Sequence, residues 1–330
     1  MKISIIIPAY NVEKYLDRCL ETCFSQDLSE KEYEVIVVND GAKDKTLDIA
    51  LRWKENHANM TVISQENQGL SMARNNGLKE ALGEYVMFLD SDDWIAENCL
   101  KLITDKCLSE KLDMLRFCAA RMINDKPYRM YSYKAYDKVI PGRNLLETKF
   151  FVCVPFAVYR KAFLIENKLS FYPGIYHEDN EFTPRAYYYA ERVGSIDDII
   201  YCLRQTPGSI THTINPKKVK DLCKVAANLK SFAEETVESK YKAAIYRQAA
   251  DCMNSCFREL NRMDADTQAP LFKDLYAIRK EITGYFVKSS SYRHKIEGLL
   301  IGICPKKMLS IHSLLDIVHY KERQKQKGIA

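Results

Sequence analysis

The sequence lacks any apolar run long enough to cross a bilayer, which takes about 20 residues in a helix. Its apolar start, residues 3–7, is stopped by Pro8 and is also too short for the core of a signal peptide. We therefore expect the protein to stay inside the cell. A cytoplasmic location is predicted, with a peripheral position at the inner face of the cell membrane as a variant of it.

Closely spaced cysteine pairs are also missing. The chain has eleven cysteines, and the nearest neighbours, Cys19 with Cys23 and Cys252 with Cys256, stand four residues apart within helical patterns. This spacing argues against a zinc site, and buried thiols in a reducing compartment explain the cysteines better. A net charge of +5 is too small to indicate a nucleic-acid partner.

No glycine-rich loop follows the first predicted strand, where the chain reads PAYNVEKY. A nucleotidyltransferase needs such a loop for its triphosphate, and a dinucleotide-dependent dehydrogenase needs G-x-G-x-x-G at this point. Both classes are therefore disfavoured.

The first ninety residues alternate between two patterns. Continuous apolar runs predict strands, and apolar residues at helical spacing predict helices between them. The predicted strands are 2–10, 33–40, 60–65 and 84–90, and the predicted helices are 12–26, 46–56 and 69–82. Strands that are apolar throughout predict an α/β fold, with a mostly parallel sheet covered by helices on both faces.

Each of these strands ends in a polar, turn-forming cluster. The clusters are residues 8–11, 39–42, 65–69 and 90–93. Because the carboxyl ends of parallel strands share one edge of the sheet, the four clusters are expected to converge on one ligand-binding crevice. Loops between strands and helices are often polar for no functional reason, which is the alternative for any single cluster.

The fourth cluster is acidic, with Asp90, Asp92 and Asp93. Carboxylate oxygens suit Mg²⁺ or Mn²⁺, which bind through one or two carboxylates together with substrate phosphates. The alternative is the N-terminal cap of a helix, and Asp93 in particular suits that position. Arg74 lies near a predicted helix N-terminus that favours an anion, or it belongs to a surface ion pair.

Five ordered segments resemble the family-two inverting glycosyltransferases of GT-A fold. They are IIIPAYN, VVNDGAKDKT, ENQGLSMARNNG, FLDSDDW and YHEDNEF, within residues 1–215. One departure is Ala42, where the family commonly has serine; it removes a hydroxyl near the nucleotide. The resemblance implies transfer of a sugar from a nucleotide diphosphate donor, with UDP as the expected nucleotide and Mn²⁺ or Mg²⁺ as the cofactor.

The resemblance also assigns residues to roles. The residues implied to bind the donor are Pro8, Ala9, Tyr10, Asn11, Glu13, Asp40, Asn67, Gly69, Arg74, Asp90, Ser91, Arg204, Ser209 and Thr211. Asp92 is implied as the direct metal ligand, and His212 as a third ligand or a diphosphate contact. Asp179 is implied as the catalytic base that takes the proton of the acceptor hydroxyl, and Glu178 is expected to shape the acceptor site.

The expected acceptor is a glycan, a polymer or a lipid-linked intermediate in the synthesis of cell-surface polysaccharide. The alternative is a non-catalytic protein of the same fold that binds sugar nucleotides or glycans, or that acts as a scaffold. Residues 1–216 are predicted to form the catalytic domain.

Residues 217–330 are predicted to form a helical region. Its apolar segments 299–304 and 308–318 are flanked by lysines and an arginine. Such a pattern indicates either a peripheral contact with an anionic membrane or an ordinary helix that packs on the protein and carries a solvated basic tail.

Overall fold

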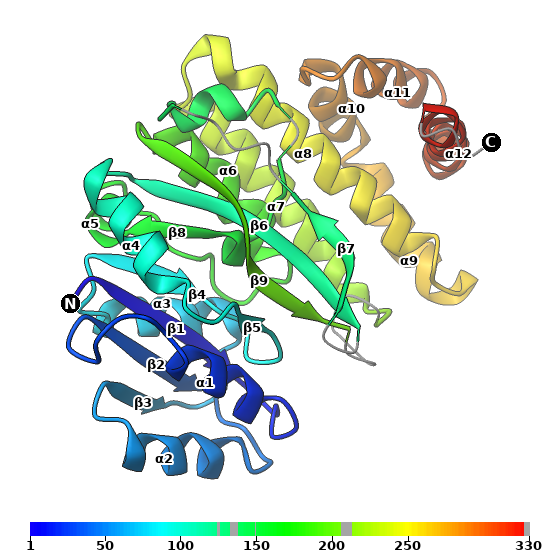
Figure 1. Cartoon of the computed structure of the whole chain (residues 1–330). Helices are drawn as coiled ribbons and strands as arrows, with labels where there is room; N and C mark the ends of the chain where they lie inside the picture. The colour runs from blue at the N-terminus through cyan, green and yellow to red at the C-terminus, as the bar shows by residue number, and fades with distance from the viewer. Residues whose placement is uncertain (124–125, 133–137, 149, 206–212, 327–330) are drawn as a thin grey trace. The chain divides into compact units, whose positions relative to one another are not determined.

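The computed structural model describes residues 1–123, 126–132, 138–148, 150–205 and 213–326, with only the backbone for 318–326. The chain divides into two compact units (Figure 1). Unit 1 comprises Met1–Gly174 with Arg185–Ser209, and unit 2 comprises Ile175–Pro184 with Ile210–Ala330. The predicted catalytic domain of residues 1–216 stays a prediction.

Unit 1 is built on a nine-stranded sheet in the order β3-β2-β1-β4-β8-β6-β9-β5, with β7 paired to β6. The strands are β1 (Ile3–Ala9), β2 (Tyr33–Asn39), β3 (Met60–Ser64), β4 (Tyr85–Phe88), β5 (Trp94–Ile95), β6 (Met114–Ile123), β7 (Lys126–Tyr131), β8 (Ala157–Arg160) and β9 (Val193–Arg204).

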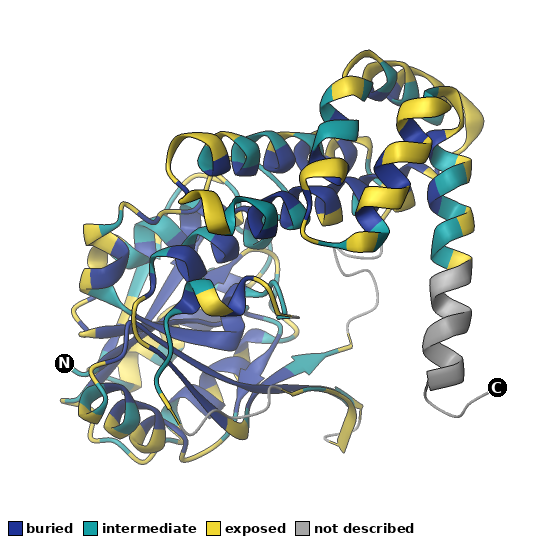
Figure 2. Cartoon of the chain, turned by 90° about the horizontal axis from the view of Figure 1, so that it is seen from above, coloured by how far each residue is buried: buried dark blue, intermediate teal, exposed yellow. Residues whose placement is uncertain are grey.

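The first four strands are parallel, as their continuous apolar runs predict. Every residue of β1 and β2 is buried, and Figure 2 shows most of the sheet in dark blue. The rest of the sheet is mixed. β8 pairs antiparallel with β4 and β6, β6 and β9 are parallel, and β5 returns antiparallel to β9.

Helices of unit 1 pack on both faces of the parallel strands. They are α1 (Leu16–Phe24), α2 (Thr46–Asn56), α3 (Leu70–Glu80), α4 (Leu100–Ser109) and α5 (Lys161–Glu166), with short 3-10 turns η1 (Gly142–Leu145) and η2 (Val154–Phe156). α1, α2 and α4 share one core cluster with Ile3, Ile5 and Ile7. α3 lies against Ile6 on the other face, where a Cβ added to Gly77 would come within 2.4 Å of Ile6 Cγ2.

α6 (Glu178–Tyr189) begins in unit 2 and ends in unit 1. The other helices of unit 2 are α7 (Pro216–Glu235), α8 (Ser239–Leu260), α9 (Ala265–Ala277), α10 (Arg279–Lys288), α11 (Tyr292–Ile303), η4 (Pro305–Lys307) and α12 (Met308–Gln326). Their starts follow local capping chemistry. The Asn215 side chain accepts a hydrogen bond from the Lys217 amide, and Asp264 accepts one from the Thr267 amide.

Candidate active site

The loops that follow β1 and β2 are tied to each other. Asn11, in the left-handed region with φ of 52°, accepts a hydrogen bond from the Lys43 amide at 2.8 Å. Glu13 accepts one from the Lys45 amide at 3.0 Å. Of the other predicted donor residues on this loop, Pro8 and Ala9 are buried at the end of β1, whereas Tyr10 is 47% exposed. Tyr10 therefore has an accessible ring, as a stacking role requires.

Asp40 fixes the loop that follows β3. Its carboxylate is 3% exposed and accepts hydrogen bonds from Gln65 Nε2, the Gln68 amide and the Gly69 amide at 2.7–2.8 Å. Gly41 next to it has φ of 71°, and a Cβ there would lie 2.9 Å from the Asn67 nitrogen. The two loops therefore pack backbone against backbone, which holds Asn67 and Gly69 at the end of β2.

Arg74 lies beneath the acidic cluster. Its guanidinium Nη2 is 2.7 Å from Asp90 Oδ1, its cationic carbon lies 5.4 Å from the centre of the Phe171 ring, and the side chain is 1% exposed. This burial leaves almost no surface for direct contact with a ligand. The predicted contact between Arg74 and the diphosphate stays a prediction, and the observed role of Arg74 is to hold Asp90.

Asp93 is anchored by β9. Tyr201 Oη donates to its Oδ2 at 2.8 Å, and the Arg204 amide donates to its Oδ1 at 2.7 Å. Burial raises the pKa of Asp93 well above its usual range, and the charges of Asp92 and Asp90 add to this rise, against the two hydrogen bonds. The interpretation of Asp93 as a helix cap is wrong, because β5 follows it and α4 begins only at Leu100.

The Arg204 side chain contacts the acidic loop, and its predicted pairing with the diphosphate stays a prediction. Its Nε donates to the Asp92 carbonyl at 3.0 Å. Its guanidinium carbon lies 4.9 Å from the Trp94 ring centre and 5.3 Å from that of Tyr15. Its contacts with these two aromatic rings orient the Arg204 guanidinium beside the acidic loop. Tyr15, Trp94 and Tyr201 were not predicted as site residues from the sequence, although Trp94 directly follows the acids.

The structure leaves the metal prediction open. Asp92 is partly exposed and Ser91 is buried. Among the described residues, no group of three or more His, Cys, Asp or Glu side chains is placed to hold a metal ion. Ser209, Thr211 and His212, which were predicted to bind donor or metal, lie outside the described residues.

Glu178 and Asp179 occupy the first turn of α6, in unit 2, where the helix dipole favours carboxylates. Glu178 is buried and Asp179 is partly exposed. His177, to which the sequence analysis gave no role, precedes them with φ of 64°, and its buried Nε2 has no hydrogen-bond partner in the described structure. Burial, and then the charge of Lys218, hold the pKa of His177 below its usual value, so this ring is neutral near pH 7.

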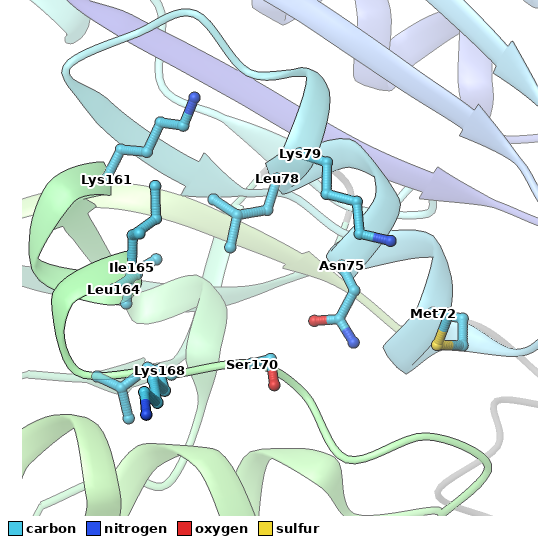
Figure 3. A pocket seen from close by; sticks show the side chains of 10 residues that line it. Met72, Asn75, Leu78, Lys79, Lys161, Leu164, Ile165, Lys168 and Ser170 are labelled. Atoms are coloured by element: carbon cyan, nitrogen blue, oxygen red, sulfur yellow. The ribbon is translucent and has the colours of Figure 1, made fainter.

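A separate cavity of about 490 Å³ lies between α3, α5 and the chain after α5. Figure 3 shows its lining of Met72, Asn75, Leu78, Lys79, Lys161, Leu164, Ile165, Lys168, Leu169 and Ser170. It includes none of the predicted site residues. The candidate site is therefore the open edge of the sheet, formed by the loops after β1, β2, β3 and β4.

The chain is similar in sequence to known glycosyltransferases. Residues 4–167 match the family model described as Glycosyl transferase family 2. Over 99% of the chain and 98% of the relative, the sequence is 27% identical to the uncharacterized glycosyltransferase EpsJ of Bacillus subtilis. It is 33% identical to the poly(ribitol-phosphate) beta-N-acetylglucosaminyltransferase TarS of Staphylococcus aureus, over 61% of this chain and 35% of that protein.

Two solved structures share the fold. The crystal structure of S. aureus TarS 1-349 in complex with UDP-GlcNAc superposes with a TM-score of 0.73 at 23% identity, covering 99% of this chain and 92% of that one. The mannosyltransferase PcManGT of Pyrobaculum calidifontis, in complex with GDP-Man and Mn²⁺, gives 0.54 at 17% identity, covering 90% and 87%. The predicted fold is thereby confirmed.

Proposed function

This chain is a glycosyltransferase of family 2, and from that premise we propose that it transfers a sugar from a UDP-sugar to a hydroxyl of a polymeric or lipid-linked glycan acceptor, with inversion at the sugar carbon. The complex of TarS with UDP-GlcNAc supports UDP as the nucleotide. The acceptor polymer in the name of TarS supports a role in building cell-surface polysaccharide. Free thiols at all eleven cysteines support a cytoplasmic location.

The proposal depends mainly on how three neighbouring acids, Asp90, Asp92 and Asp93, are held in the structure. Asp90 is held by Arg74, and Asp93 is held by Tyr201 and Arg204. Asp92 stands between them, partly exposed at the end of β4, next to the loops that follow β1 and β2. Asp90 is also partly exposed, and two partly exposed carboxylates beside the buried Asp93 suit a cation carried by a diphosphate.

The carboxylate oxygens at this site fit Mn²⁺ or Mg²⁺, and Asp92 is the residue that would hold the cation. The hard carboxylate oxygen matches either cation, and the charges of Asp92 and Asp90, which add to the effect of burial in raising the pKa of Asp93, are the kind a cation neutralises. When bound, such a cation neutralises charge on the leaving diphosphate. The complex of PcManGT with Mn²⁺ supports this cofactor. Metal dependence remains part of the proposal.

The remaining roles follow from the side chains at the site. Arg204, oriented by Trp94 and Tyr15, pairs with the diphosphate as it leaves. Arg74 is a positioning residue that holds the Asp90 carboxylate in place for the ribose. Asp179 accepts the proton of the acceptor hydroxyl while that oxygen bonds to the sugar carbon and the bond from this carbon to the diphosphate breaks.

Kinetics with a panel of UDP-sugars, with and without Mn²⁺, tests these roles. We expect Asp179→Asn to lower kcat/KM by about 10²-fold or more, the usual range for a lost general base, and Asp92→Asn to lower it because the cation is no longer held at the diphosphate. Asp179→Asn should keep the thermal shift produced by UDP, whereas Asp92→Asn should lose the part that depends on Mn²⁺. Asp105→Asn, an exposed acid of α4 paired with Lys101, is the matched control and should transfer normally.

Near-normal transfer by Asp179→Asn would show that the base is elsewhere. Transfer that is equal with Mn²⁺ and with a chelator would contradict the metal assignment. Binding of UDP-sugars without transfer to any offered acceptor would contradict the proposed reaction and favour a binding protein.

A further inference from the structure

α11 packs with its polar residues inward and its apolar residues outward. The buried residues of this helix are His294, Glu297, Gly298 and Ile301. The exposed ones include Tyr292 at 79%, Ile296 at 40%, Leu299 at 59%, Leu300 at 40% and Ile303 at 77%. These five residues, here named the α11 face, recur every three to four positions and form one continuous stripe. An amphipathic helix on a soluble protein normally shows the opposite arrangement.

Polar contacts fix this inverted orientation. Glu297, with no exposed surface, is hydrogen-bonded through Oε1 to His312 Nδ1 at 3.0 Å, and His312 itself is 1% exposed. Arg293 pairs with Asp316 of α12 at 2.5 Å. Turning α11 to hide its apolar stripe would break both contacts and leave the buried polar side chains of Glu297 and His312 without each other, which is costly in a protein interior. The outward stripe is therefore built into the packing of the unit.

The exposed charges beside the α11 face are positive. Lys295 on the helix and Lys306 and Lys307 in η4 are exposed. Between residues 292 and 307 the sequence contains one acid, Glu297, and it is buried. The surface thus combines an apolar stripe with lysines and lacks exposed carboxylates in this described segment.

The length of α11 shows whether this helix can cross a bilayer or only lie on its surface. Within the described chain, no single helix is long and apolar enough to span a membrane, and α11 reaches the required length only with the start of α12, across a bend of 120°. Its 12 residues extend about 18 Å, against roughly 30 Å of hydrocarbon. A surface position fits these dimensions.

We propose that the α11 face lies in the interface of an anionic lipid bilayer, with Lys295, Lys306 and Lys307 against the lipid phosphates. A second copy of the chain is a poorer occupant, because a symmetric contact would bring the same lysines together, whereas anionic lipid neutralises them. The proposal goes beyond sugar transfer, and it places the enzyme where lipid-linked acceptors are found.

Co-sedimentation of the full chain with vesicles tests this contact. We expect binding to vesicles of phosphatidylcholine with phosphatidylglycerol, and much weaker binding to phosphatidylcholine alone. Leu299→Ser with Ile303→Ser should lower the partition coefficient by at least about tenfold, since apolar burial contributes to it. Lys306→Gln with Lys307→Gln should lower it by about 30-fold, at roughly 1 kcal/mol per lysine. Leu82→Ser, at a residue of unit 1 that is 72% exposed, is the matched control and should bind as wild type.

Two results would overturn the proposal. One is equal vesicle binding by wild type and the Leu299→Ser, Ile303→Ser variant, both folded by circular dichroism. The other is light scattering that shows a wild-type dimer, a monomeric variant and no vesicle binding by either. The assay contains no sugar nucleotide, and Asp179→Asn should bind vesicles normally, so its failure is distinguishable from failure of the proposed reaction.

Discussion

At the scale of single residues, Asp44 joins the two loops on which the nucleoside is expected to rest. Its carboxylate accepts hydrogen bonds from Thr46 Oγ1 at 2.5 Å and from the amides of Thr46 and Glu13 at 3.0 Å. Partial burial acts to raise the pKa of the Asp44 carboxyl, but these hydrogen bonds outweigh it and hold the pKa below its usual range. Ionised Asp44 therefore stabilises the folded state.

This linkage predicts a stability difference that depends on pH. Asp44→Asn should lower the free energy of unfolding by about 1 kcal/mol near neutral pH, a modest value because the group is partly exposed. The difference from wild type should be complete above the unfolded pKa of about 3.9 and should vanish as the pH falls through the lower folded pKa. Urea denaturation between neutral and strongly acidic pH measures it. A difference that is constant across this range would show that the carboxylate charge is not the cause.

At the scale of elements, the approach of α3 to β1 depends on the small size of Gly77. Alanine normally stabilises a helix interior by about 1 kcal/mol relative to glycine. At this position the new methyl would meet Ile6 Cγ2 at 2.4 Å and Val38 Cγ2 at 3.2 Å, both on fully buried strands.

We expect Gly77→Ala to lower the free energy of unfolding by about 1–2 kcal/mol, because overpacking outweighs the gain in helix propensity. Gly284→Ala in α10 is the matched control, since nothing lies within 4 Å of its added Cβ, and it should raise stability by roughly 0.5–1 kcal/mol. Chemical denaturation followed by circular dichroism compares the two. Opposite signs are the expected result, and a gain for both variants would show that α3 can move away from β1.

The sequence predicts elements well where the pattern is local. The helix predicted over 46–56 is α2, and the four apolar runs are β1 to β4. It could not predict that Tyr201 anchors Asp93, because this contact depends on antiparallel pairing of β5 with β9 across more than a hundred residues. Periodicity likewise shows that Leu299 and Ile303 share a face of α11, but the direction of that face depends on the contacts of Glu297.

At the scale of the whole molecule, the predicted donor contacts that lie within the described residues fall in unit 1, and the predicted base falls in unit 2. A UDP-sugar with Mn²⁺ should therefore slow amide exchange in the loops after β1 to β4 and at the end of β9, and leave α8 to α10 unchanged. Protection of residues 177–182 should require an acceptor in addition. Hydrogen-exchange mass spectrometry resolves these segments, and donor protection centred on α8 to α10 would place the donor site elsewhere.

The anchoring of Asp93 by β9 also affects when the acidic loop can form during synthesis of the chain. Tyr201 follows Asp93 by 108 residues, so a growing chain, at about 5–20 residues per second, contains the aspartate for on the order of ten seconds before its partner exists. During that interval β1 to β4 can pair, but Asp93 has no tyrosine to hold it and is stabilised by water. The acidic loop is therefore completed late in synthesis, and a ribosome that stalls before residue 201 presents a sheet on which Asp93 still lacks its anchor.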